Sequence, residues 1–229
     1  MTTPVDDGGF SAQLRHDVAD LWESLCDHPF VVEMARGTLD PQRYLFYIEQ
    51  NLLYLPEYAR AIALGVAKTT DRAGLEAFTD LLVNIVATEL PQNRLLRDRV
   101  RELAGGGSAA PTQMAPATLA YSSYLLSVAS LGDERAIRTL ILPCAWSYGD
   151  IASRLQSGVV DHPVYSEWFR FFASPDYTEL VRQMRAAFDA DTAGCSAKER
   201  EQLTGIFRNA TRLERQFWDM GYHQIQWPG

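Results

Sequence analysis

The hydrophobic positions of this chain recur every three or four residues along most of its length. The first segment, 10–26, carries one such apolar stripe, formed by Phe10, Leu14, Val18, Leu21 and Leu25. This spacing is typical of an amphipathic helix, and we expect one helix over the whole segment. No alternating run of strand length is bounded by hairpin turn residues. The pattern therefore predicts an all-α fold.

Prolines and capping residues indicate where the helices begin and end. Asp40 followed by Pro41 is typical of a helix start and predicts a long helix that runs towards Lys68. Pro56 lies inside that helix, and because proline has no backbone donor we expect a kink or a break into two helices there. Further helices are predicted over 71–103, 117–131, 133–156, 165–172 and 175–190, and a last one from a capping box at Ser196 and Glu199 to about Tyr222.

Nothing in the chain marks a boundary between domains. There is no internal repeat, no sustained heptad pattern and no shift in composition, and 229 residues can bury a full core. We therefore expect residues 1–229 to form a single all-helical domain. Residues 1–9 are predicted to be disordered, and the glycine-rich segment 105–116 is predicted to be a flexible loop.

Charge and cysteine content narrow the classes of partner and compartment. The 29 acidic residues outnumber 21 basic ones, giving a net charge of −8 without basic clusters, so neither nucleic acid nor a membrane is an expected partner. The cysteines Cys26, Cys144 and Cys195 are odd in number and far apart, which argues against a disulfide framework. The N-terminus lacks the basic and apolar regions of a signal peptide. We expect a reduced, cytoplasmic protein.

Two glutamates occupy positions on apolar helical stripes. Glu214 falls between Phe207 and Phe217, where burial should raise its pKa and leave a carboxylic acid able to transfer protons near neutral pH. The alternative is an ion pair with an arginine that holds two helices in register. Glu89 shows the same pattern, and there we favour a structural or supporting role because Arg94 is close along the chain.

Asn51 shares a helical stripe with several tyrosines, among them Tyr47, Tyr54 and Tyr58. An amide among aromatic side chains is suited to bind a planar heterocycle, which it can hydrogen-bond while the rings stack on it. A core amide satisfied by tyrosine hydroxyls would give the same pattern. The spacing leaves both interpretations open.

Cys144 follows Pro143 inside a helical pattern and shares a helix face with Tyr148 four residues later. Pro143 has no N–H group to donate, so one backbone hydrogen bond of the helix is missing near the thiol. The segment therefore indicates a shaped pocket with a nucleophilic cysteine. The alternative is a buried thiol that acts as a small hydrophobic side chain. Cys26 and Cys195 lack this context and are predicted to be inert.

Metal and nucleotide cofactors are not indicated. Of the four histidines, none stands three or four residues from an inward-facing carboxylate, as a di-iron bundle requires. No glycine-rich phosphate motif is present. We expect no metal and no other cofactor.

Several short segments, in order along nearly the whole chain, resemble the TenA/THI-4 family, the thiaminase II group. The most specific are Pro-Cys-x-Trp-x-Tyr at 143–148 and Glu-x-x-Phe-Trp at 214–218. The others include His28-Pro29-Phe30, the tyrosine-rich segment that ends at Tyr54-Leu55, Ala120-Tyr121, and His162-Pro163 with Tyr165 and Trp168.

The resemblance implies a helical bundle like that of haem oxygenase but without haem, assembled as a dimer or tetramer. It also implies hydrolysis of thiamin or its aminopyrimidine degradation products to 4-amino-5-hydroxymethyl-2-methylpyrimidine. Cys144 would be the nucleophile that adds to the ring, and Glu214 would protonate a ring nitrogen. The family's pocket positions match Tyr54, Tyr121, Tyr148 and Phe217.

Three positions depart from the family pattern around the same pocket. Asn51 stands where an aspartate is usual, Phe172 where a tyrosine is common, and Asn93 where a histidine often follows four residues after the carboxylate at Glu89. These changes predict an altered substrate preference or a reduced activity. A non-catalytic pyrimidine-binding or regulatory relative is therefore an alternative hypothesis, and a di-iron redox protein on the same scaffold is a third.

Overall fold

The computed structural model describes residues 8–106 and 113–228. Within these ranges the chain forms helices and no strand, so the predicted all-α class is confirmed. Most of the predicted disordered segment 1–9 and the middle of the predicted loop 105–116 lie outside the described residues. The helices are α1 (Phe10–Asp17), α2 (Ala19–Cys26), α3 (Pro29–Ala35), α4 (Pro41–Lys68), α5 (Arg72–Asn84), α6 (Leu90–Leu103), α7 (Pro116–Leu131), α8 (Glu134–Leu155), α9 (Tyr165–Phe172), α10 (Pro175–Thr192) and α11 (Ala197–His223).

The first predicted helix is interrupted, which corrects the expectation of one helix over 10–26. Val18 has φ −120° and ψ 24°, outside the helical region, and it separates α1 from α2. Both pieces bury the same side of the segment, with Leu14 on α1 and Trp22 on α2 fully buried. Because the apolar stripe continues across Val18, periodicity alone could not reveal the interruption.

Helix α4 begins as predicted and continues through Pro56. The Asp40 carboxylate accepts a hydrogen bond of 2.9 Å from the backbone N–H of Gln42, with Pro41 at the first helical position. The helix remains a single element to Lys68, so a break into two helices at Pro56 is wrong. Buried side chains on both sides of the proline, such as Tyr54 and Tyr58, pack into the core and offset the lost backbone bond.

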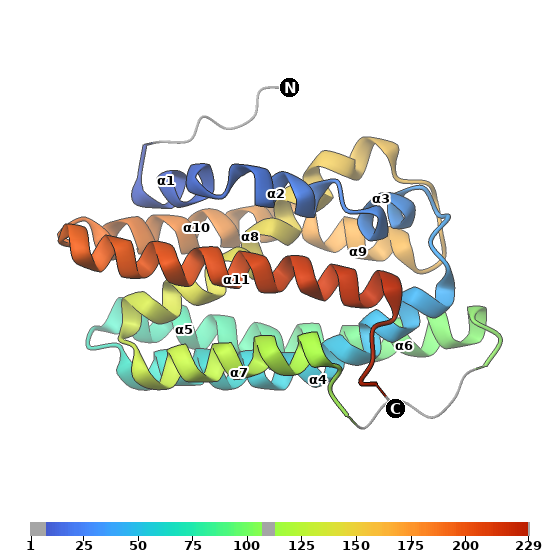
Figure 1. The fold of residues 1–229 in the computed structure, drawn as a ribbon, viewed down its shortest axis with the longest axis horizontal. Coiled ribbons are helices and arrows are strands. Elements are labelled where there is room, and N and C mark those ends of the chain that lie inside the picture. Colours follow the sequence, from blue (N-terminus) through green and yellow to red (C-terminus); the bar gives the residue numbers. More distant parts are fainter. Residues whose placement is uncertain (1–7, 107–112, 229) are drawn as a thin grey trace.

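Three helices carry the centre of the molecule (Figure 1). Helix α11 runs along the middle of the view and packs on α8, α7 and α4. Helices α5, α6 and α7 surround α4 on one side, whereas α9 and α10 pack on α8 on the other side. Side chains of α4, α8 and α11 meet in one continuous core of buried apolar residues.

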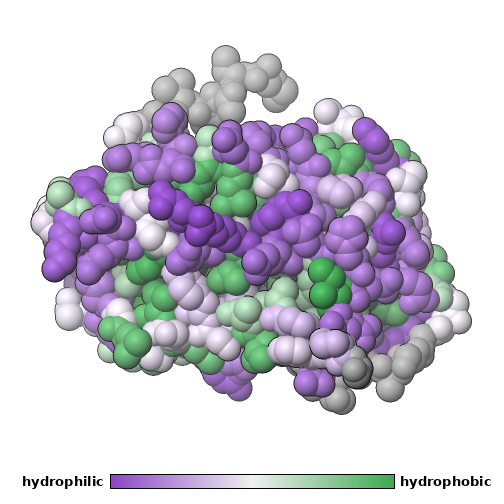
Figure 2. Space-filling view, viewed as in Figure 1, coloured by the Kyte–Doolittle hydropathy of each residue, from purple (hydrophilic) through white to green (hydrophobic). Residues whose placement is uncertain are grey.

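The last helix starts with the predicted capping box. Ser196 and Glu199 exchange hydrogen bonds between side chain and backbone, which satisfies donors at the helix start. The face that α11 crosses is mostly hydrophilic, with hydrophobic residues in separate small groups (Figure 2). None of the helices in the described ranges has the length and apolar character required to cross a membrane.

Candidate active site

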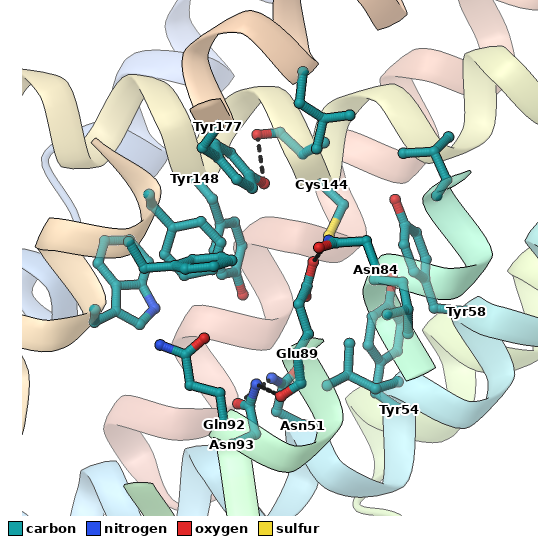
Figure 3. A pocket seen from close by; sticks show the side chains of 18 of the residues that line it. Asn51, Tyr54, Tyr58, Asn84, Glu89, Gln92, Asn93, Cys144, Tyr148 and Tyr177 are labelled. Atoms are coloured by element: carbon teal, nitrogen blue, oxygen red, sulfur yellow. Dashed lines mark hydrogen bonds between the residues drawn. The ribbon is translucent and has the colours of Figure 1, made fainter. Parts of the chain in front are cut away.

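An aromatic pocket lies between α4, the α5–α6 segment, α8, α9 and α10 (Figure 3). Six of the predicted site residues line it: Asn51, Tyr54, Glu89, Cys144, Tyr148 and Phe172. The walls are predominantly apolar and aromatic, and a few polar side chains project between the rings. Such a composition is typical of sites for small planar ligands.

Cys144 is placed on the pocket wall by tyrosines that hold the backbone on both sides of it. The Tyr58 hydroxyl donates a hydrogen bond of 3.2 Å to the carbonyl of Ile141, and Tyr177 donates one of 3.1 Å to the carbonyl of Ala145. Pro143 lies inside α8 without ending the helix. The backbone that carries the thiol is therefore tied to α4 on one side and to α10 on the other.

The resting form of Cys144 is the thiol. Burial raises its pKa well above the ordinary value of 9.0, and the carboxyl groups of Glu214 and Glu89 raise it further. The side chain is partly accessible because it faces the cavity. Since the thiolate is the nucleophilic form, a base must take the proton as the sulfur reacts.

Glu214 lies directly behind the thiol, in the core of α11. Its side chain is only 2% exposed, and it accepts a hydrogen bond of 2.6 Å from the Tyr121 hydroxyl. Burial raises the pKa of Glu214 to about 7, although contacts with Tyr121 and, more loosely, with Cys144 lower it. The partners are thus a phenol and a thiol, and the alternative of a structural arginine pair is wrong for Glu214.

Three predicted residues stand behind the pocket wall instead of on it. Glu214, Tyr121 and Phe217 are buried and reach the cavity through other side chains. The rings of Tyr121 and Phe217 lie 4.9 and 5.6 Å from the ring of Tyr54, measured between centroids. Tyr54 therefore separates this buried group from the open space.

The opposite wall is formed by Tyr148, Phe172 and Trp168. Tyr148 contacts Phe172 edge to face at 5.0 Å between centroids, and Phe172 lies 4.6 Å from Trp168. The Tyr148 hydroxyl is hydrogen-bonded to that of Tyr47 at 3.1 Å. Phe172, which lacks the hydroxyl of the family's usual tyrosine, contributes only its ring to this wall.

Glu89 lies on a π-helical turn, Ile85–Glu89, between α5 and α6. Its carboxylate accepts a hydrogen bond of 3.0 Å from Asn84, and burial raises its pKa to about 7. The side chain is half-buried and lines the cavity. Arg94 is exposed and Asn84 is the hydrogen-bond partner, so a structural role based on Arg94 is wrong.

The π-helical turn has a local cause in the sequence. Pro91 lies two residues after the end of the turn, in the first turn of α6. A proline ring clashes with the carbonyl four residues earlier in a regular α-helix, and a wider turn relieves that clash. Widening also brings residues five apart onto one face, which is why Asn84 can reach Glu89.

Asn51 is hydrogen-bonded to Asn93 and not to tyrosine hydroxyls. Its Nδ2 donates to Oδ1 of Asn93 at 3.0 Å, and Nδ2 of Asn93 donates to the backbone carbonyl of Glu89 at 2.8 Å. Two of the three departures from the family pattern are therefore in direct contact. Figure 3 shows Asn51, Asn93 and Glu89 grouped at one side of the pocket.

Sequence reasoning missed several residues that line the pocket. Asn84 lies five residues before Glu89, a spacing that places it off the apolar stripe of a regular helix. Tyr177 stands in the first turn of α10, where a single aromatic residue carries no functional signal. The proline at 91 is the one sequence feature that could have indicated the irregular turn beside them.

The histidines, cysteines and carboxylates of the described ranges do not gather into metal sites. Among residues 8–106 and 113–228, no group of three or more of these side chains is placed to hold a metal ion. The pocket instead combines a thiol, two carboxyl groups of raised pKa and aromatic faces. These groups suit covalent addition to an electron-poor ring with proton transfer.

The fold and the pocket define a helical protein with a cysteine and a carboxyl group poised beside an aromatic cavity. The model of the TENA/THI-4/PQQC family matches residues 15–224, so the chain belongs to this family. The resemblance recognised in its motifs is confirmed.

Individual relatives resemble the chain over nearly its whole length. It is 36% identical to the aminopyrimidine aminohydrolase of Halalkalibacterium halodurans, over 95% of this chain and 97% of that protein. The solved TenA homologue from P. horikoshii OT3 is 28% identical, with a TM-score of 0.83 over 94% of this chain and 99% of the other. Haem oxygenase from Leptospira interrogans, 13% identical, has a TM-score of 0.60 over 92% and 98% of the two chains and shares the fold.

Proposed function

We propose that this protein is an aminopyrimidine hydrolase of the thiaminase II type. It releases 4-amino-5-hydroxymethyl-2-methylpyrimidine from thiamin or from its aminopyrimidine degradation products. The observation that carries the proposal is the position of Cys144, whose thiol faces an aromatic cavity with the Glu214 carboxyl directly behind it. The name of the Halalkalibacterium relative supports the same activity.

The pyrimidine ring binds between the aromatic walls. Tyr54 and Tyr148 line the cavity with their rings from α4 and α8, and Phe172 adds an apolar edge. Asn51 and Glu89 contact the substrate from the polar side of the cavity. Stacking and a few hydrogen bonds hold the ring so that a ring carbon faces the sulfur of Cys144.

The first step is addition of Cys144 across a carbon–nitrogen bond of the ring. The sulfur forms a bond to the ring carbon, and the electron pair of the C=N bond moves to the ring nitrogen. Glu214 in its carboxylate form takes the thiol proton, and the proton reaches that nitrogen through the Tyr54 hydroxyl, which lies between Glu214 and the cavity beside Cys144. A carboxyl group with a pKa of about 7 is suited to both transfers near neutral pH.

Loss of aromaticity then allows the bond from the exocyclic methylene to the leaving group to break. The leaving amine or thiazole departs with the electron pair of that bond. Water adds to the methylene carbon and loses a proton, so a hydroxyl group replaces the leaving group. An amine leaving group takes up that hydrogen, whereas the thiazole of thiamin departs as the neutral heterocycle and the proton is released. When the carbon–sulfur bond breaks, the ring regains aromaticity and Cys144 recovers its proton. The net change is hydrolysis.

Assembly and location are part of the same proposal. We infer a homo-oligomer, a dimer or tetramer, that works in the cytoplasm. The family resemblance supports the assembly, and the acidic net charge of −8 and the cysteine pattern support the compartment.

Turnover of aminomethylpyrimidine and of thiamin by the purified protein tests the activity. We expect wild-type protein to release the hydroxymethylpyrimidine, Cys144→Ala to release none, and the matched control Cys195→Ala to retain activity. Absence of turnover by the wild type would contradict the proposal. Iron analysis of the same sample separates this hypothesis from a di-iron redox protein, which requires bound iron.

A second candidate is a non-catalytic pyrimidine-binding or regulatory protein. Asn51 favours it, because an amide in place of the family's usual aspartate cannot accept a proton from the thiol. Binding of the hydroxymethylpyrimidine by wild-type protein that turns over neither substrate would support this candidate.

A further inference from the structure

The hydrogen bonds around Asn51 determine the orientation of two side-chain amides. The backbone carbonyl of Glu89 is an acceptor only, so Asn93 must direct its NH2 group towards it, at 2.8 Å. The oxygen of Asn93 then faces Asn51 and can only accept. Asn51 must therefore direct its own NH2 group towards Asn93, at 3.0 Å.

These hydrogen bonds leave the one acceptor atom of Asn51 for a ligand. Its Oδ1 has no hydrogen-bond donor among the described residues, while the side chain lines the pocket and is 9% exposed. An amide oxygen accepts hydrogen bonds and carries no full charge. A ligand at this point is recognised through an N–H group that it donates.

We propose that Asn51 and Asn93 form one specificity unit, which selects a ring that donates an N–H group to Oδ1 of Asn51. The Glu89 backbone carbonyl determines which way the two amides of this unit point. Asn51 is the specificity-determining residue, and Asn93 is a positioning residue that acts through it. The identity of the ring as a pyrimidine rests on the proposed function. The hydrogen-bonded pairing of the two amides does not rest on that function.

The unit makes position 51 dependent on position 93. In the single variant Asn51→Asp, a carboxylate replaces the donor and faces the oxygen of Asn93. If Asn93 turned over to donate to the carboxylate, its oxygen would instead face the Glu89 carbonyl. Either arrangement opposes two acceptors in a buried place, which is costly.

A histidine at position 93 would resolve this conflict. Protonated imidazole has two N–H donors, one for the carboxylate and one for the Glu89 carbonyl. Neutral imidazole has one donor and one acceptor and so also matches Asn51. We therefore expect Asn93→His to be tolerated, Asn51→Asp to be harmful, and the double variant to recover.

The experiment is a double-mutant cycle with two readouts. The first is the dissociation constant of the hydroxymethylpyrimidine product, and the second is the melting temperature without ligand. For Asn51→Asp we expect binding weaker by about 5- to 100-fold and a lower melting temperature. The double variant should return both towards wild type. The matched control is Asn209→Asp, the same change on an exposed side chain.

An analogue with hydrogen in place of the ring's amino group tests what the unit recognises. We expect wild-type protein to bind it at least about tenfold more weakly than the amino compound. Equal binding of the two compounds, or no binding of either, overturns the proposed selection.

The cycle also separates this proposal from the proposed function. If Asn51→Asp melts at the wild-type temperature, or if the double variant shows no recovery, the coupling between the two amides is overturned. This holds whatever reaction the protein catalyses. Wild-type protein that binds the product but hydrolyses nothing contradicts the proposed function while leaving the cycle measurable.

Discussion

The two glutamates of the pocket share a raised pKa but are held by different kinds of structure. Glu214 and Glu89 each have a pKa of about 7, because burial disfavours the charged form of both. Glu214 lies in a regular part of α11 and is bound by Tyr121 from α7. Glu89 ends a π-helical turn and is bound by Asn84 from its own segment.

The helices around the two carboxyl groups also differ in how completely their side chains are buried. The wall around Glu214 is made of long helices with fully buried side chains such as Phe207 and Trp218. The wall around Glu89 belongs to α5 and α6, which bury few residues and expose large ones such as Val83 and Leu95. Burial raises the pKa of both carboxyl groups to a similar value. The raised pKa by itself therefore does not assign a role to either glutamate. Glu214 contacts the thiol, whereas Glu89 affects it through charge.

Replacement of Glu214 should give the largest effect. We expect Glu214→Gln to lower kcat about 10²- to 10⁴-fold, because the amide keeps the shape and can accept from Tyr121 but cannot relay a proton. Steady-state kinetics with aminomethylpyrimidine measures this. Tyr121→Phe, which keeps the acid, serves as the matched control and should lose less. A Glu214→Gln enzyme within tenfold of wild type would remove the carboxyl group from the mechanism.

The pH dependence of stability should show the next largest effect. The folded protein holds the Glu214 proton more tightly than the unfolded chain, whose pKa is near the ordinary 4.5. The contribution of this tighter proton binding to the free energy of unfolding is fully present below pH 4.5. It is lost as the pH rises to about 7. The loss is on the order of 3 kcal/mol in the free energy of unfolding.

Urea unfolding at pH 5 and pH 7.5 measures this change. Glu214→Gln and Glu89→Gln should each remove a similar part of the decrease, because the pKa of both carboxyl groups is raised to about 7. An unchanged decrease in Glu214→Gln would show that the carboxyl group is not buried as described.

Replacement of Glu89 should give the smallest effect and a different kinetic pattern. We expect Glu89→Gln to raise KM by about tenfold or less and to leave kcat nearly unchanged, because Glu89 contacts the substrate side without touching the thiol. Asn84→Ala should act in the same direction. A fall in kcat as large as that of Glu214→Gln would show that the two carboxyl groups share one role.

Regular helices and their apolar stripes could be predicted from the sequence. The stripe of α4 that carries Asn51 and Tyr54 faces the pocket as expected, and α9 has the predicted bounds. The interruption at Val18 and the π-helical turn before Pro91 could not be predicted from a period of 3.6 residues, because the apolar stripe continues across both.

The pairing of the polar residues depended on the fold. Asn51 and Asn93 were recognised separately as departures from the family pattern, and only the packing of α6 on α4 brings them into contact. Glu89 was assigned to a neighbouring arginine, whereas the wider turn gives it Asn84.

The sequence by itself determined the all-α class, the family, and the thiol and carboxyl group that lie at the pocket. These follow from local periodicity and from short motifs, which are properties of neighbouring residues. The tertiary structure decided the rest: that Glu214 and Tyr121 stand behind the wall, and that the oxygen of Asn51 has no hydrogen-bond donor among the described residues. Hydrogen-bond partners 42 and 93 residues apart depend on how separate helices pack, and no local pattern specifies that packing.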